Sequence, residues 1–146
     1  NIGDKVCDLY GGVGLFTMGI SERIGENGYV HLVESDNYAT KDARKIFKNH
    51  KNVLVRKGRV EKELPLVDSV DVILLDPPRN GAGSLVVDQM VSKNPRTIVY
   101  VSCDPASLAR DTKLLLENNY SLDKIIAVDL FPMTHHIECI AKFIKT

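Results

Sequence analysis

The sequence contains no tryptophan, few aromatic residues (6% of 146) and only three cysteines, Cys7, Cys103 and Cys139. Their odd number and wide spacing fit neither a disulfide framework nor a paired metal knuckle, so we expect a reducing, cytoplasmic setting. No apolar run reaches the length of a bilayer span, and no basic stretch precedes an apolar segment as in a signal peptide. Because the chain begins at Asn1 rather than Met, we expect it to be a piece of a longer protein.

Charge is balanced overall but unevenly distributed. The chain has 19 Lys and Arg against 19 Asp and Glu, and 44% of its residues are apolar, which is typical of one compact domain spanning 1–146. Between Lys41 and Glu63 there are nine basic residues against three acids, while the balance elsewhere is ten against sixteen. Such a segment can contact a phosphate backbone, but a solvated helix face is the commoner explanation and is the interpretation favoured here.

Apolar segments of strand length alternate with segments of helical periodicity. Strands are predicted at Lys5–Tyr10, Tyr29–Glu34, Asn52–Arg56, Val70–Leu75, Thr97–Ser102, Lys124–Phe131 and Ile137–Ile144. Helical periodicity is found at Phe16–Ile24, Ala39–Phe47, Val86–Val91 and Ala106–Asn118. This alternation predicts a doubly wound α/β domain with a mostly parallel sheet, whose ligands bind at the carboxyl ends of the strands. The link between the last two strands is too short for a crossover helix, so the final strand should be antiparallel.

A glycine-rich turn follows the first predicted strand, from Asp8 to Gly14, and Glu34 closes the second strand 20 residues later. Glycines allow close approach of a ligand, and an acid at that distance can accept both ribose hydroxyls, which indicates an adenosine-type cofactor. Thr17 occupies the position of the third glycine in the dinucleotide fingerprint, and Asp8 would repel a pyrophosphate. The pattern therefore favours S-adenosylmethionine over a nicotinamide dinucleotide. A turn of purely structural use is the alternative.

Two further strand ends carry candidate side chains. Asp76 and Arg79, in the sequence Asp-Pro-Pro-Arg, end the fourth strand at the edge of the predicted cleft, although an Asp there can also simply cap a turn. Cys103 follows the fifth strand, and Asp104 and Pro105 are suited to cap and begin the next helix. A thiol near a helix N-terminus is favoured as thiolate, so Cys103 is a candidate nucleophile. An inert small hydrophobic residue is the competing interpretation.

His135, His136 and Glu138 stand at the start of the last predicted strand. Adjacent residues on a strand point to opposite faces, so the two histidines diverge and no metal site is expected. Glu138 is a candidate general base, with a solvated glutamate on an edge strand as the alternative.

Together these segments resemble the RNA uracil-5-methyltransferase family, which forms 5-methyluridine in transfer or ribosomal RNA with S-adenosylmethionine. The resemblance rests on four ordered motifs along nearly the whole chain: Asp8-Leu9-Tyr10 with Gly12 and Gly14, Asp76-Pro77-Pro78-Arg79-Asn80-Gly81, Ile98–Cys103 and Val128–Glu138. It implies a class I methyltransferase fold. Asp104 departs from the family, which usually has Asn after the nucleophile, and the RNA-binding portion that members carry upstream is not among these residues.

The resemblance also implies roles for individual residues. Cys103 would be the nucleophile and Glu138 the proton acceptor, and the cofactor contacts would be Tyr10, Gly12, Gly14, Glu34 and Asp76. Carbon 5 of uracil is a poor nucleophile, so a thiolate first adds to carbon 6, and a base later removes the proton from carbon 5. Two other functions stay open: methylation of another base or a small molecule, and a cofactor-binding interaction module without activity.

Overall fold

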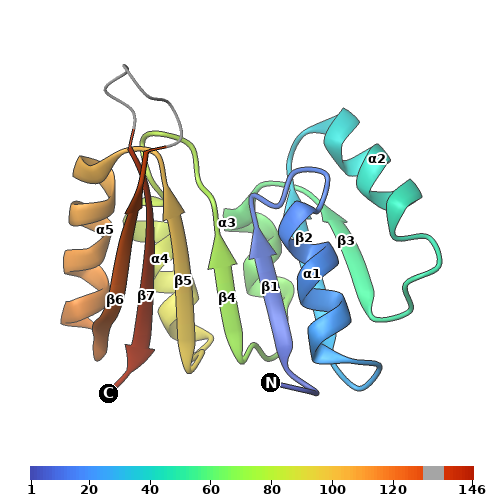
Figure 1. Ribbon diagram of the computed structural model, residues 1–146, viewed down its shortest axis with the longest axis horizontal. Helices are drawn as coiled ribbons and strands as arrows, with labels where there is room; N and C mark the ends of the chain where they lie inside the picture. Colours follow the sequence, from blue (N-terminus) through green and yellow to red (C-terminus); the bar gives the residue numbers. More distant parts are fainter. Residues whose placement is uncertain (130–136) are drawn as a thin grey trace.

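A seven-stranded sheet with the order β3-β2-β1-β4-β5-β7-β6 forms the centre of the computed structural model, which describes residues 1–129 and 137–146 (Figure 1). The strands are β1 (Lys5–Leu9), β2 (Tyr29–Glu34), β3 (Val53–Lys57), β4 (Val72–Leu75), β5 (Thr97–Ser102), β6 (Tyr120–Val128) and β7 (Glu138–Lys145). Strands β1 to β5 pair in parallel, and β7 is antiparallel to both β5 and β6. The predicted doubly wound sheet with an antiparallel final strand is confirmed.

Helices cover the sheet on both faces. They are α1 (Leu15–Ile24), α2 (Asn37–Ile46), α3 (Val60–Glu63), α4 (Gly83–Ser92) and α5 (Pro105–Glu117), with a short 3-10 helix at Leu64–Leu66. Apolar residues of α1 and α2 pack on one face of β1 and β2, and those of α3, α4 and α5 pack with the opposite face (Figure 1). The strand order reverses between β1 and β4, which places the topological switch point at the carboxyl ends of these two strands.

The largest core cluster lies between one face of the sheet and the helices α3, α4 and α5. Ile98 and Tyr100 of β5 and Ala141 and Phe143 of β7 are buried there, in strict alternation with more accessible neighbours. Burying an apolar side chain of this size contributes about 1.5–3 kcal/mol to the stability of the fold. The alternation of buried and accessible residues therefore determines which face of β5 and β7 packs against the core.

Two stretches differ from the expected elements. The short helix α3 and the 3-10 turn after it escaped detection because four residues cannot establish a helical period. Strand β6 begins at Tyr120 rather than Lys124, because the charged pair Asp123-Lys124 interrupts the apolar pattern of an outermost strand. The expected end of that strand, 130–131, lies outside the described residues. No helix in 1–129 or 137–146 is long and apolar enough to cross a membrane.

Candidate active site

The turn after β1 is held tightly between β2 and α2. Gly14 has φ +95°, and a Cβ at this position would lie 2.3 Å from the ring of Phe47, so only glycine fits. The Gly14 amide donates to the carbonyl oxygen of Gly11 at 2.9 Å, closing the turn. Tyr10 and Gly12 also have positive φ. The turn therefore has a fixed shape that brings its backbone to the end of the sheet.

Asp8 is a fully buried carboxylate beneath this turn. Its Oδ2 accepts a hydrogen bond from the Thr17 hydroxyl at 2.6 Å, whereas its Oδ1 has no partner within the described part of the chain. Burial, together with the negative charges of Asp76 and Glu34, raises the pKa of Asp8 to about 6 against the lowering effect of the Thr17 hydrogen bonds. A buried carboxylate oxygen that lacks a hydrogen-bond partner suits a ligand that donates hydrogen bonds or carries positive charge.

Glu34 joins the glycine turn to the start of α2. Its Oε2 accepts from the Gly12 amide at 3.0 Å and its Oε1 from the Asp36 amide at 2.7 Å. Asp36 in turn caps α2 by accepting from the amides of Tyr38 and Ala39, each at 2.8 Å. Oε1 also accepts from the Ser35 hydroxyl at 3.4 Å, whereas Oε2 keeps a further lone pair for a ligand, so the carboxylate is both fixed and able to bind.

A cavity of about 200 Å³ opens beside Glu34. Residues that follow four different parallel strands line it, among them Tyr10, Glu34, Ser35, Arg59, Glu61 and Asn80. Arg59 donates to Glu61 at 3.2 Å, so an ion pair forms part of this wall. Since complete small-molecule sites typically measure about 300–1,000 Å³, this cavity suits one part of a larger ligand.

Asp76 follows β4 next to the turn after β1. Its amide donates to the carbonyl oxygen of Leu9 at 3.2 Å, which ties it to the end of β1. Desolvation raises the pKa of the Asp76 carboxyl, and the negative charge of Glu138 raises it further. The two carboxylates are therefore near enough to interact, and β7 brings Glu138 toward the switch point.

Cys103 and Glu138 lie at the same end of the neighbouring strands β5 and β7. The antiparallel ladder between β5 and β7 pairs Ser102 with Cys139, so the next two positions outward are Cys103 and Glu138. Cys103 directly follows the last residue of β5, and Glu138 is the first residue of β7. Both residues are half-buried. Among the described residues, the lining of the cavity beside Glu34 includes neither of them.

The helix α5 begins directly after Cys103. Asp104 is its N-cap, with Oδ1 accepting from the Ser107 amide at 2.7 Å, and Pro105 is the first helical residue, as expected. The Ser107 hydrogen bonds hold the pKa of Asp104 below its usual range. The carboxylate that replaces the family's usual Asn thus has a structural role as a cap, and the helix dipole points its positive end toward the thiol.

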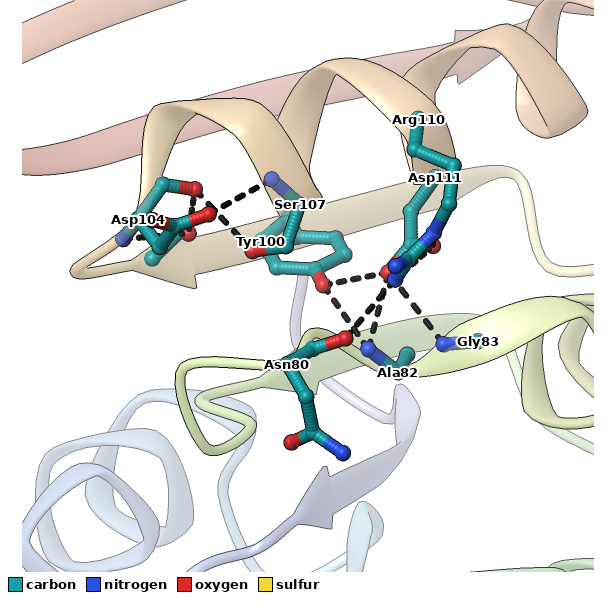
Figure 2. Close-up of polar contacts among 9 residues, drawn as sticks. Asn80, Ala82, Gly83, Tyr100, Asp104, Ser107, Arg110 and Asp111 are labelled. Carbon is teal, nitrogen blue, oxygen red and sulfur yellow. Dashed lines mark hydrogen bonds and ion pairs between the residues drawn. The ribbon is translucent and has the colours of Figure 1, made fainter.

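A buried carboxylate from α5 holds the loop that follows β4 (Figure 2). Oδ2 of the fully buried Asp111 accepts from the Tyr100 hydroxyl at 2.7 Å and from the amides of Ala82 and Gly83 at 2.8 and 3.3 Å. Arg110 donates to Asp111 Oδ1 at 2.9 Å and to the carbonyl oxygen of Asn80 at 2.8 Å. The helix that begins after Cys103 is therefore bonded to the loop that lines the cavity.

Gly81 lets this loop approach α5. It has φ +75°, and a Cβ there would lie 2.6 Å from Asp111 Oδ2 and from Arg110 Nη2, whereas Gly83, at φ +77°, has open space. We expect Gly83→Ala to lower the free energy of unfolding by about 1–2 kcal/mol through backbone strain alone. Gly81→Ala should lose a further 1–3 kcal/mol or so through overpacking. Urea unfolding measures both, and equal losses would contradict the close approach.

Comparison with known proteins identifies the family. The sequence profile of tRNA (uracil-5-)-methyltransferases matches residues 54–145. The chain belongs to this family. An RNA methyltransferase from Streptomyces avermitilis, itself uncharacterized, is 47% identical over 141 residues, which cover 95% of this chain and 33% of that protein. A second RNA methyltransferase, from Streptomyces coelicolor, is 44% identical over 141 residues, which cover 31% of that protein. The chain thus spans about a third of the length of these relatives.

Solved structures agree with this assignment. The tRNA (uracil-54, C5)-methyltransferase of Pyrococcus abyssi, in complex with S-adenosyl-L-homocysteine, superposes with a TM-score of 0.80 at 32% identity, covering 97% of this chain and 34% of that one. Fibrillarin from Aeropyrum pernix, with bound S-adenosyl-L-methionine, has a TM-score of 0.79 at 19% identity, which reflects the fold alone. The fold is that of class I methyltransferases dependent on S-adenosylmethionine.

Most residues singled out in the sequence of this family member lie at one end of the sheet. Tyr10, Gly12, Gly14, Glu34 and Asp76 follow β1, β2 and β4, and Cys103 and Glu138 lie beside them at β5 and β7. His135 and His136 lie outside the described residues, as does most of the closing motif. In the described ranges no group of three or more His, Cys, Asp or Glu is arranged to hold a metal ion.

Sequence reasoning missed Asp111 and the wall residues Ser35 and Glu61. Asp111 did leave a signal, because it occupies the buried stripe of α5 together with Leu108 and Leu115. An acid on the apolar face of a helix requires buried partners, and here Tyr100 and two backbone amides supply them.

Proposed function

We propose that this chain is a single methyltransferase domain that transfers a methyl group from S-adenosylmethionine to carbon 5 of a uridine in tRNA or rRNA. The observation that carries the proposal is the antiparallel pairing of β5 with β7, which brings a cysteine and a glutamate, Cys103 and Glu138, to the same end of neighbouring strands beside the switch point of the sheet. Family membership supports RNA uracil as the substrate class. The position of the methyl group follows from the chemistry of this residue pair.

The residues around the switch point fit S-adenosylmethionine. Glu34 Oε2 has a lone pair available for a ribose hydroxyl, and Tyr10, Gly12 and Gly14 give the turn its shape. Asp8 has an acceptor oxygen without a partner in the described residues, and Asp76 adds another carboxylate. Such a concentration of negative charge would repel phosphates but suits a cation. When bound, the cofactor supplies an electrophilic methyl group on a sulfonium.

The protein's own groups perform the remaining chemistry. The Cys103 thiolate adds to carbon 6 of uracil, forming an S–C bond and moving the double-bond electrons toward carbon 5. Once carbon 5 carries the methyl group, Glu138 accepts the proton from that carbon. The released electron pair re-forms the bond between carbons 5 and 6, and the sulfur leaves as thiolate. The target base must leave its stack to reach these two side chains.

The proposal predicts one methylated product. We expect the chain, incubated with a uridine-containing tRNA transcript and S-adenosylmethionine labelled in its methyl group, to place the label in 5-methyluridine after digestion to nucleosides. Label found in a different nucleoside would contradict the assignment of carbon 5, and absence of label under saturating cofactor would contradict the activity.

The same assay tests the cofactor site. Glu34→Gln replaces one acceptor oxygen by an NH2 donor that opposes the amide of either Gly12 or Asp36. We expect at least a tenfold rise in KM for S-adenosylmethionine and in Kd for S-adenosylhomocysteine, on the order of 1.4 kcal/mol. Glu26→Gln, at an exposed position of a different loop, is the matched control and should bind as the wild type. Equal Kd values would remove Glu34 from the site.

A further inference from the structure

The outward side of α2 is basic and has little negative charge to balance it. Four cations, Lys41, Arg44, Lys45 and Lys48, are exposed on the helix and its following turn, while Thr40, Ala43 and Phe47 are buried beneath them. The single exposed acid within this stretch, Asp42, is already paired with Lys45 at 3.0 Å. We call Tyr38, Lys41, Arg44, Lys45 and Lys48 the α2 face.

Helix stability alone does not explain this arrangement. Lys41 with Lys45, and Arg44 with Lys48, are like charges four residues apart, and each such pair costs a helix about 0.2–0.5 kcal/mol. The helix dipole favours cations in the last turn, which accounts for Arg44 and Lys45 but not for Lys41. A solvated helix face typically mixes both signs of charge. An anionic partner would remove the repulsion.

Tyr38 supplies a second, independent observation. Its side chain is 81% exposed at the first turn of α2, three and seven residues before Lys41 and Lys45 and therefore on the same side of the helix. An aromatic ring that packs so little in the protein is available to stack on a nucleic acid base. Aromatic and basic side chains together are the usual composition of surfaces that bind unpaired RNA segments.

The α2 face also reaches the proposed active site. Tyr38 follows Glu34 by four residues, and its amide is bonded to Asp36, whose own amide is bonded to Glu34. Next to α2, β3 is the edge strand of the sheet, and exposed Lys57 at its end is paired in register with Glu34. Figure 1 shows α2 at this end of the sheet, on the outer side of β2 and β3.

We propose that the α2 face is a docking surface for the RNA substrate, on which the four cations contact phosphates and Tyr38 stacks on an unpaired base. This proposal rests on the proposed function for its partner, because an RNA must be present for the surface to guide. It departs from the interpretation favoured from the sequence, in which this charge run is only a solvated helix face.

The test measures binding of a fluorescent tRNA transcript between about 50 and 200 mM salt. In Lys41→Gln/Arg44→Gln/Lys48→Gln, we expect at least a tenfold loss of affinity at the lower salt concentration. The slope of log K against log salt should fall by about two, since each lost phosphate contact removes roughly 0.7–0.9. The matched control is Lys113→Gln/Lys124→Gln/Lys145→Gln, which removes the same charge from exposed positions on α5, β6 and β7. Equal losses in the two variants would overturn the proposal.

The stacking role of Tyr38 is tested separately in the same binding assay. Tyr38→Ala should weaken binding about fivefold or more, as expected for a lost base stack of about 1–3 kcal/mol, while the salt slope stays unchanged. Tyr38→Phe should restore the affinity. No loss with alanine, or no rescue with phenylalanine, would contradict stacking.

Two controls separate this proposal from folding and from the proposed function. Removing like charges should leave Tm unchanged or slightly raised, and Kd for S-adenosylhomocysteine should not change. If the wild type binds the transcript through the α2 face but transfers no methyl group, the proposed function fails and the docking surface stands. If the wild type shows no salt-dependent RNA binding, the docking surface is refuted whatever the transfer assay gives.

Discussion

RNA carrying 5-fluorouridine is expected to become covalently attached to this protein in the presence of S-adenosylmethionine, and Cys103→Ala is expected to abolish the attachment. Fluorine at carbon 5 cannot be removed by a base as a proton is, so the S–C bond to Cys103 cannot be broken by elimination. A denaturing gel should show a stable protein–RNA band for the wild type only. Transfer to ordinary RNA should fall at least about 10³-fold in the variant, because the alternative path lacks the covalent step.

Cys139 provides the matched control. It is the neighbour of Glu138 and the register partner of Ser102, but its side chain is 7% exposed and belongs to the core cluster. Cys139→Ala should therefore still form the adduct. A band that persists in Cys103→Ala, or disappears in a folded Cys139→Ala, would show that Cys103 is not the nucleophile.

Much of the fold could be predicted because each strand is bounded by recognisable residues. Tyr29–Glu34 and Thr97–Ser102 coincide with β2 and β5, and the short link before Ile137 predicted the antiparallel β7. These predictions depend on the local periodicity of apolar residues and on the number of residues between strands, and both can be obtained from the sequence alone.

The candidate site was predictable where its residues end strands. The carboxyl ends of parallel strands lie at one edge of the sheet, so Glu34, Asp76 and Cys103 had to lie along the same edge once the sheet was assumed. Register was not predictable. That Cys139 pairs with Ser102, so that Glu138 comes to the same end of the sheet as Cys103, depends on pairing between strands that sequence periodicity does not specify.

The hydrogen bonds that Asp111 accepts could not be predicted for a related reason. Its partners are a tyrosine on β5 and two amides after Gly81, which come together only when α5 packs against the loop (Figure 2). A sequence reveals that an acid sits on an apolar helix face, but the donors that satisfy it are a property of the tertiary structure.

Glu138→Gln should convert the enzyme into one that stalls after methyl transfer. The amide is nearly isosteric but cannot accept the proton on carbon 5, so sulfur cannot leave and a covalent complex should accumulate with ordinary uridine. We expect turnover to fall about 10²–10⁴-fold, which is the usual contribution of a general base. Labelled methyl should migrate with the protein on a denaturing gel. The control is Asp123→Asn, which removes an exposed carboxylate of β6 that is paired with Lys142 of β7. This variant should behave as the wild type.

A second readout of Glu138→Gln does not require catalysis. The negative charge of Glu138 contributes to the raised pKa of Asp76, so removing that charge should lower the Asp76 pKa, shifting its titration toward more acidic pH. Carboxyl-selective NMR titration of the two proteins measures this shift directly. A variant that loses turnover while Asp76 titrates as before would place Glu138 away from the switch point, since a charge that catalyses beside Asp76 must also be felt by its carboxyl group.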